Sequence, residues 1–176
     1  MNKADQIVEI DSSDSGNLFS EIEKRMPQNQ KIIIGIDGAP GSGKTNLSYR
    51  IGARLQGNVI NLDDYLSQNT GRYFRALNFG LLRQKINVRP DILVIEGCCL
   101  RQAMDFLEVK IDVSIYCKEI SQGTRLWYFG TYFDQDLPAA KVGISPIESE
   151  VIEYHDQYQP WKEADIIYNL INQQKR

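Results

Sequence analysis

The feature that most constrains this chain of 176 residues is a glycine-rich octapeptide at residues 38–45, Gly-Ala-Pro-Gly-Ser-Gly-Lys-Thr. It matches the pattern G-x-x-x-x-G-K-[ST] at every position. The run of isoleucines at residues 32–36 before it predicts a strand buried on both faces. Leu47, Ile51 and Leu55 follow it at helical spacing and predict an amphipathic helix. A strand, a glycine-rich turn and a helix in this order predict a phosphate-binding loop.

Each part of this motif has a role in binding a phosphate chain. The glycines let the backbone turn tightly, so that successive N–H groups converge on phosphate oxygens, and the following helix directs its positive end toward the same anion. Lys44 can reach the β- and γ-phosphates, and the Thr45 hydroxyl can ligate Mg²⁺. The predicted nucleotide-binding residues are Gly38, Ala39, Pro40, Gly41, Ser42, Gly43, Lys44, Thr45 and Asn46.

Apolar segments typical of strands alternate with helical segments along the rest of the chain. Further strands are predicted at residues 58–62, 91–96, 111–117 and 164–168, and further helices at 73–87 and 146–158, the last opened by a capping box at Ser145. Five strands with intervening helices predict a three-layer α/β domain over residues 31–176, with a mainly parallel sheet and helices on both faces.

The first 30 residues are predicted to precede this domain. Residues 1–14 are polar and acidic and predict a loosely ordered leader. Apolar residues at helical spacing from Leu18 to Met26 predict a short helix that packs on the domain, with Ser15 as its cap.

Three acidic residues stand at the predicted carboxyl ends of two strands. Glu96 ends the apolar strand at residues 91–96, where a carboxylate can hold hydrated Mg²⁺ beside a phosphate loop. A surface glutamate at the end of a strand is the alternative. Asp63 and Asp64 follow the strand at residues 58–62. An aspartate there could accept the proton of an attacking hydroxyl, help to organise Mg²⁺, or simply cap a helix.

Together these segments resemble the uridine kinase and phosphoribulokinase group of P-loop kinases, which includes nicotinamide riboside kinases and bacterial pantothenate kinase. The resemblance covers residues 31–170 in the order of the family. It rests on residues 34–45, on Leu-Asp-Asp-Tyr at 62–65, on Val-Ile-Glu-Gly at 94–97, and on Gln-Tyr-Gln-Pro at 157–160 leading to Ala-Asp-Ile-Ile at 164–167.

The resemblance implies a P-loop NTPase fold whose five strands have the order 2-3-1-4-5. It also implies ATP and Mg²⁺ as cofactors, and a small metabolite as the phosphate acceptor, with a nucleoside or ribosyl compound as the first choice. Asp63 would be the catalytic base on the acceptor hydroxyl, with Asp64 as the reserve candidate. Glu96 would position Mg²⁺ together with Thr45 and Asp63.

The segment after the Asp-Asp pair is predicted to contact the acceptor. Tyr65, Arg72 and Tyr73 are the candidate substrate-binding residues, and a solvated start of a helix is the alternative for the last two. Because kinases of the family often form oligomers, the resemblance also suggests a homo-oligomer.

One departure from the family concerns the lid. Active members carry several arginines after the fourth strand, which neutralise the phosphoryl group during transfer. Here Arg125 is the only arginine between Arg101 and Arg176, and it is the candidate for this catalytic role, with Lys118 and Lys141 as the alternatives. The strongly aromatic segment at residues 126–133 is predicted to be core or a subunit contact. The sparse lid leaves open a second function, a nucleotide-binding regulator or degenerate kinase with little or no transfer.

Composition excludes several other classes. A net charge of −3 lacks the basic footprint of a nucleic-acid-binding protein, and no apolar run approaches the roughly 18 residues that cross a bilayer. Three cysteines do not make a disulfide framework and predict a reducing, cytoplasmic setting. The adjacent Cys98 and Cys99 are predicted to be small buried hydrophobes, and His155, the only histidine, a packed or surface residue.

Overall fold

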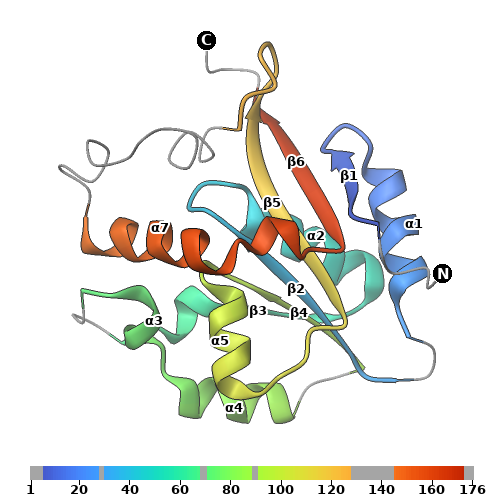
Figure 1. The fold of residues 1–176 in the computed structure, drawn as a ribbon. Coiled ribbons are helices and arrows are strands. Elements are labelled where there is room, and N and C mark those ends of the chain that lie inside the picture. Colours follow the sequence, from blue (N-terminus) through green and yellow to red (C-terminus); the bar gives the residue numbers. More distant parts are fainter. Residues whose placement is uncertain (1–5, 28–29, 68–70, 89–90, 128–144, 173–176) are drawn as a thin grey trace.

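The computed structural model describes residues 6–27, 30–67, 71–88, 91–127 and 145–172, whose strands form one six-stranded sheet. The strands are β1 (Val8–Asp11), β2 (Ile32–Gly38), β3 (Asn58–Asn61), β4 (Ile92–Glu96), β5 (Val113–Ser121) and β6 (Ile166–Asn172). They lie in the order β1-β6-β5-β2-β4-β3, and every pairing is parallel (Figure 1). The carboxyl ends of all the strands therefore point toward one edge of the sheet.

The prediction of five strands in the order 2-3-1-4-5 is wrong, because the described sheet has six. The additional strand, β1, lies in the segment predicted to be a loosely ordered leader, and it pairs with β6 from Val8 opposite Ile166 to Asp11 opposite Asn169. Only Ile10 of its four residues is buried, which is too short a pattern to indicate a strand. Without β1, the strands lie in the order β3-β4-β2-β5-β6.

Helices cover both faces of the sheet (Figure 1). They are α1 (Ser15–Arg25), α2 (Lys44–Leu55), α3 (Tyr73–Ala76), α4 (Phe79–Asn87), α5 (Leu100–Leu107) and α7 (Pro146–Tyr158), with 3₁₀ turns η1 (Leu62–Tyr65) and η2 (Pro160–Lys162). Buried side chains of α1 and α2 pack on one face, and those of α4, α5 and α7 on the other. No helix in the described segments combines the length and the apolar character needed to cross a membrane.

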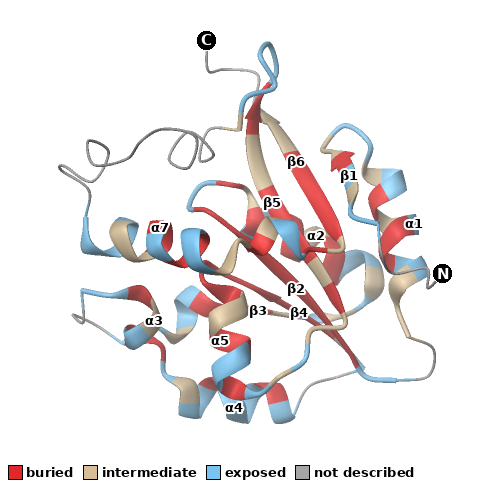
Figure 2. Ribbon diagram, in the orientation of Figure 1, coloured by how far each residue is buried: buried red, intermediate tan, exposed pale blue. Residues whose placement is uncertain are grey.

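The sheet is the centre of two hydrophobic cores, because successive side chains of a strand point to opposite faces. In β2, Ile32, Ile34 and Ile36 join the core under α1 and α2, whereas Ile33 joins the core under α4, α5 and α7. All seven residues of β2 are buried, which explains its continuous apolar run (Figure 2). The predicted phosphate loop therefore begins at the carboxyl end of a fully buried strand.

The helix predicted over residues 73–87 is two helices, α3 and α4, separated at Leu77 and Asn78. The break follows from local hydrogen bonds: Asn78 accepts the N–H of Leu81 on its side chain at 3.1 Å and donates its own N–H to the carbonyl of Tyr65 at 2.8 Å. Leu77 also forms an antiparallel bridge with Leu66. These contacts fasten the segment after β3, which contains Asp63.

The ends of two other helices can be compared with their predicted caps. The capping box at Ser145 is confirmed, since Ser145 and Glu148 exchange side-chain and backbone hydrogen bonds at 2.8 and 3.2 Å. The cap of α1 is Asp14 rather than Ser15, because its carboxylate accepts the N–H of Asn17 at 3.3 Å. Helix α5 was not predicted.

Gly97 provides a test of how closely these elements fit. A Cβ added to Gly97 would lie 2.7 Å from Cβ of Leu62, which begins the turn after β3. We expect Gly97→Ala to destabilise the fold by about 1–3 kcal/mol through overpacking, measured by urea unfolding. The matched control is Gly123→Ala, since nothing lies within 4 Å of a Cβ there. Equal stability of the two variants would contradict this packing.

Candidate functional site

The predicted phosphate loop connects β2 to α2 at the carboxyl edge of the sheet. Gly38 begins it with a φ of 154°, and a Cβ there would come within 2.6 Å of the carbonyl oxygen of Cys117. Lys44 is buried, and its Nζ donates a hydrogen bond to the carbonyl of Ala39 at 2.8 Å. The side chain of Lys44 is therefore folded back onto the first residues of its own loop.

Glu96 lies beside this loop, as predicted. It ends β4 with only 2% of its surface exposed, and its Oε1 accepts a hydrogen bond from the Thr45 hydroxyl at 2.8 Å. The strand register explains the position, because Glu96 pairs with Ile36 of β2 on one side and with Asn61 of β3 on the other. The structure thus brings together the end of the loop and the strand-terminal carboxylate.

The Thr45–Glu96 pair fits a hard divalent cation, because a hydroxyl and a carboxylate supply only oxygen donors. Across the described ranges, no group of three or more His, Cys, Asp or Glu side chains could hold a metal ion. Mg²⁺ does not require such a group, since it commonly takes one or two protein oxygens and completes its shell with phosphates and water. Thr45 and Glu96 are therefore the residues that would hold Mg²⁺ here, together with a bound phosphate chain.

Asp63 is oriented by a buried neighbour. It lies in η1 just after β3, where its N–H donates to Oδ1 of Asn61 at 2.8 Å. The hydroxyl of Tyr73 donates to Oδ1 of Asp63 at 2.6 Å. Burial, with the hydrogen bond to Asp63, raises the pKa of Tyr73 far above its usual value, so the hydroxyl stays protonated. The carboxylate of Asp63 is thus exposed, and one of its two oxygens accepts the hydrogen bond from Tyr73. The neighbouring Asp64 is also exposed.

The charge of Lys44 is stabilised by its surroundings. Burial acts to lower its pKa, but nearby groups outweigh it and the pKa is raised. The thiols of Cys98 and Cys117 are among these groups, yet burial raises their own pKa values to about 11 and about 12, which leaves them neutral at pH 7. The carboxylates of Glu96 and Asp37 also act to raise the pKa of Lys44.

Asp37 is a site residue that the sequence analysis did not identify. It directly precedes the loop and is buried, and its Oδ1 accepts the N–H of Gly38 at 2.7 Å. Its Oδ2 accepts hydrogen bonds from the hydroxyl of Tyr154 and, at 3.3 Å, from the N–H of Arg101. Burial raises the pKa of Asp37 to about 6, although these hydrogen bonds act in the opposite direction. A charged residue ending an otherwise apolar strand was the available signal.

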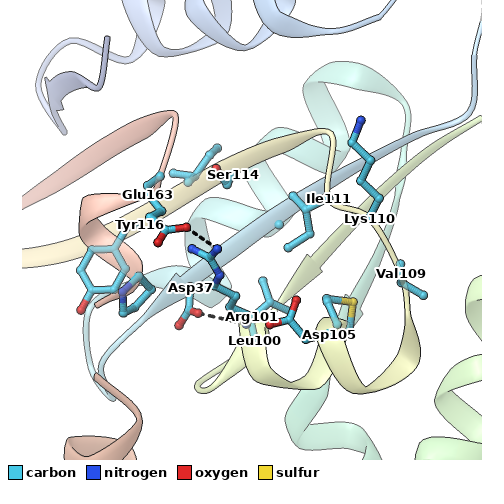
Figure 3. A pocket seen from close by; sticks show the side chains of 15 residues that line it. Asp37, Leu100, Arg101, Asp105, Val109, Lys110, Ile111, Ser114, Tyr116 and Glu163 are labelled. Carbon is cyan, nitrogen blue, oxygen red and sulfur yellow. Dashed lines mark hydrogen bonds and ion pairs between the residues drawn. The ribbon is translucent and has the colours of Figure 1, made fainter. Parts of the chain in front are cut away.

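Asp37 also reaches a cavity on the α5 face of the sheet. The cavity has a volume of about 290 Å³ and lies over β2 and β5, between α5 and η2. Figure 3 shows Asp37 among its lining side chains, together with the ion pair between Arg101 and Glu163. Because Asp37 lines the cavity and directly precedes Gly38, the cavity lies next to the start of the predicted phosphate loop.

Arg125, the predicted lid arginine, is engaged elsewhere. Its guanidinium donates to both carboxylate oxygens of Asp11, at 2.9 and 3.0 Å, which ties the turn after β5 to β1. The hydrogen bond and charge of Arg125 also lower the pKa of Asp11, although burial opposes them. The structure thus holds Arg125 at the β1 side of the sheet rather than bringing it to Lys44.

The predicted acceptor residues lie in η1 and at the start of α3. A pocket of about 260 Å³ between α3, α5 and α7 is lined by Arg72 and by residues of α7 that include Glu150 and Tyr154. Tyr73, next to Arg72, contacts Asp63 as described above. Tyr65 is half-buried against the core under α4 and α5. The structure therefore places the hydroxyl of Tyr73 against Asp63, and Arg72 in the wall of the neighbouring pocket.

The remaining predictions concern packed residues. Cys98 and Cys99 are free and buried, as predicted. His155 is fully buried on α7, with Nδ1 2.7 Å from the carbonyl of Val151, and burial lowers its pKa to about 4. From the aromatic segment, Trp127 packs against Tyr116 with ring centroids 5.9 Å apart, in a small core, and residues 128–133 lie outside the described ranges.

Comparison with known proteins gives the fold but no close relative. No protein-family model matches the chain, and no curated protein matches it. Among solved structures, one described as a possible uridine kinase from Bacillus stearothermophilus matches with a TM-score of 0.54 and 15% identity, over 89% of this chain and 98% of that one. The chain shares the fold of this protein, with a parallel sheet covered by helices. The predicted likeness to the uridine kinase group is thus confirmed at the level of the fold.

Two further solved structures match with lower TM-scores. A candidate fructose transport system kinase from Silicibacter sp. TM1040 has a TM-score of 0.48 and 17% identity, over 86% of this chain and 97% of that one. A shikimate kinase from Acinetobacter baumannii, solved in complex with shikimate, has a TM-score of 0.44 and 18% identity, over 82% and 85%.

The raised pKa of Asp37 predicts a measurable pH dependence of stability. Because the pKa is about 6 in the folded protein and 3.8 ordinarily, the folded state holds the proton more tightly, and this contribution is lost as pH rises from about 4 to 6. Asp37→Asn removes the titration. We therefore expect the unfolding free energy of Asp37→Asn minus that of the unmodified protein to rise by up to about 3 kcal/mol between pH 4 and 7.

Urea unfolding at a series of pH values measures this difference. His155 acts with the opposite sign, because its folded pKa of about 4 lies below the ordinary 6.5 and its contribution is lost as pH falls. It is present in both proteins and cancels in the difference. A difference that does not change with pH would contradict the buried environment assigned to Asp37.

Proposed function

We propose that this protein is an ATP- and Mg²⁺-dependent phosphotransferase that moves the γ-phosphate of ATP to a hydroxyl group of a small metabolite. The observation that carries this proposal is the hydrogen bond between Thr45 and Glu96 beside the loop that contains Lys44, with Asp63 in the turn that follows the neighbouring strand β3. A phosphate-binding loop, an oxygen-donor pair for Mg²⁺ and an exposed carboxylate then meet at one edge of the sheet. These are the parts that phosphoryl transfer requires.

Asp63 supplies the proton acceptor in this proposal. Its Oδ1 accepts from Tyr73 at 2.6 Å, and among the described residues no hydrogen bond involves Oδ2, which leaves that oxygen for the acceptor hydroxyl. As the acceptor oxygen bonds to the γ-phosphorus, its proton passes to Asp63, and the bond from phosphorus to the β–γ bridging oxygen breaks to leave ADP. Tyr73 keeps the carboxylate in place during this exchange.

The loop and its neighbours hold the charge of the transferred group. The loop amides and the ammonium group of Lys44 bind the phosphate oxygens, and Lys44 can exchange its hydrogen bond with Ala39 for one with the phosphates. Mg²⁺, when bound, neutralises negative charge on the phosphates. In this proposal Thr45 and Glu96 hold Mg²⁺ and so determine its position relative to the phosphates.

We propose that the acceptor binds against the pocket lined by Arg72, next to Tyr73 and Asp63. A nucleoside or ribosyl compound is the acceptor class that we propose first, with Tyr65, Arg72 and Tyr73 as its contacts. We also propose a cytoplasmic setting, in keeping with three free cysteines. That the protein forms a homo-oligomer stays a prediction.

A second function, a nucleotide-binding regulator with little transfer activity, is favoured by the position of Arg125. Its two hydrogen bonds to Asp11 would have to break before it could reach a γ-phosphate. A missing cation at the γ-phosphate slows transfer by a large factor without preventing nucleotide binding.

Lys44→Ala tests the nucleotide site. We expect the affinity for Mg-ATP to fall about ten- to hundredfold, since a hydrogen bond to a charged group contributes roughly 1.5–3 kcal/mol. Isothermal titration calorimetry measures it, with Lys85→Ala on the exposed side of α4 as the matched control. An unchanged affinity in Lys44→Ala would place the nucleotide elsewhere.

Asp63→Asn separates the two functions. We expect acceptor-stimulated release of ADP to fall about 10²- to 10⁴-fold, because the amide cannot take the proton, while Mg-ATP affinity is retained. The assay supplies nucleosides, pantothenate and sugar phosphates in turn. Asp64→Asn is the control for loss of charge at a neighbouring exposed position. Tight Mg-ATP binding without stimulation by any acceptor would favour the regulator.

A further inference from the structure

Helix α7 touches both sides of the site. On the nucleotide side, the hydroxyl of Tyr154 donates to Oδ2 of Asp37, whose Oδ1 accepts the N–H of Gly38 at 2.7 Å. The N–H of Arg101, at the start of α5, lies 3.3 Å from both the Tyr154 hydroxyl and Oδ2 of Asp37. Tyr154 therefore contacts Asp37, the residue that directly precedes the phosphate loop (Figure 3 shows Asp37 and Arg101).

On the acceptor side, Glu150 makes the corresponding contact. Its carboxylate accepts the N–H of Tyr73, whose hydroxyl donates to Asp63 at 2.6 Å. Glu150 and Tyr154 are four residues apart, so they lie on the same face of α7. One face of one helix thus contacts the partner of the proposed base and the residue that precedes the loop.

We propose that Glu150 and Tyr154 are positioning residues, and that α7 sets the spacing between Asp63 and the phosphate loop. The inference deepens the proposed function, on which it rests, because in-line transfer requires the base and the γ-phosphate to be held at a fixed separation. Neither residue needs to contact the reacting atoms. Each acts through a second residue: Glu150 through the backbone N–H of Tyr73, and Tyr154 through the carboxylate of Asp37.

The surroundings of these contacts explain why α7 is needed. Asp63 is exposed at the end of a strand of four residues, and the helix that contains Tyr73 is a single turn of four residues. Such short elements hold a side chain in place only where a longer element supports them. Helix α7 has 13 residues, and Val151, Ile152, Tyr154 and His155 bury its inner face.

Amide hydrogen exchange of the unliganded protein tests this connection. We expect Tyr154→Phe to speed exchange at the N–H groups of Gly38 and Tyr73 by about fivefold or more. The control is Tyr158→Phe, one turn along the same helix, because the described part of the chain shows no hydrogen bond from that hydroxyl. Exchange at Val94, in the centre of the sheet, reports global opening.

Three results would overturn the proposal: unchanged exchange at Tyr73 in Tyr154→Phe, an equal effect of Tyr158→Phe, or an equal rise at Val94. Since no acceptor is present, direct contact of Tyr154 with a substrate cannot produce the expected result. Failure to find any transfer activity would remove the proposed function but leave this measurement intact.

Kinetics provide the second test. We expect Tyr154→Phe and Glu150→Ala each to lower kcat about tenfold, with the KM for ATP changed less than about threefold, and the exposed Asp156→Ala to change neither. If α7 acts as one connection, the double variant is no slower than the slower single variant. Losses that multiply in the double variant would show two independent effects and overturn the proposal.

Discussion

The buried ammonium group of Lys44 is the charge around which this edge of the sheet is organised. A cation out of water is costly unless hydrogen bonds and opposite charges compensate it. Ala39 provides the hydrogen bond at 2.8 Å, and the carboxylates of Asp37 and Glu96 provide the opposite charge. Both carboxylates lie at the ends of adjacent parallel strands, since Ile36 pairs with Glu96. The sheet register therefore fixes the electrostatics of the loop.

The apolar core and the polar side chains of the candidate site occupy different parts of the strands. The middle of the sheet is apolar on both faces and is covered by helices, whereas the polar side chains of the site begin where the strands end. Short elements such as η1 and α3 are held by hydrogen bonds to neighbouring elements. Tyr73 is the best example, because it is buried and yet contacts the exposed Asp63.

The sequence predicts those features that depend on neighbouring residues in the chain. The glycine-rich loop, the buried strands before it and before Glu96, and the capping box at Ser145 each have a local signature. Features that depend on distant residues were missed: β1 is a strand because β6 offers an edge, and the helix at 73–87 breaks because Tyr65 and Leu66 bind its middle. The contact of Tyr154 with Asp37 joins residues 117 apart and leaves no local pattern.

The most direct test of the central claim is a crystal structure with Mg²⁺ and a non-hydrolysable ATP analogue. We expect the β-phosphate to lie within the loop at residues 38–45, Lys44 Nζ to have left Ala39 for a phosphate oxygen, and Mg²⁺ to contact the Thr45 hydroxyl. A nucleotide bound in the cavity beneath α5, or phosphates that do not touch the loop amides, would contradict the account.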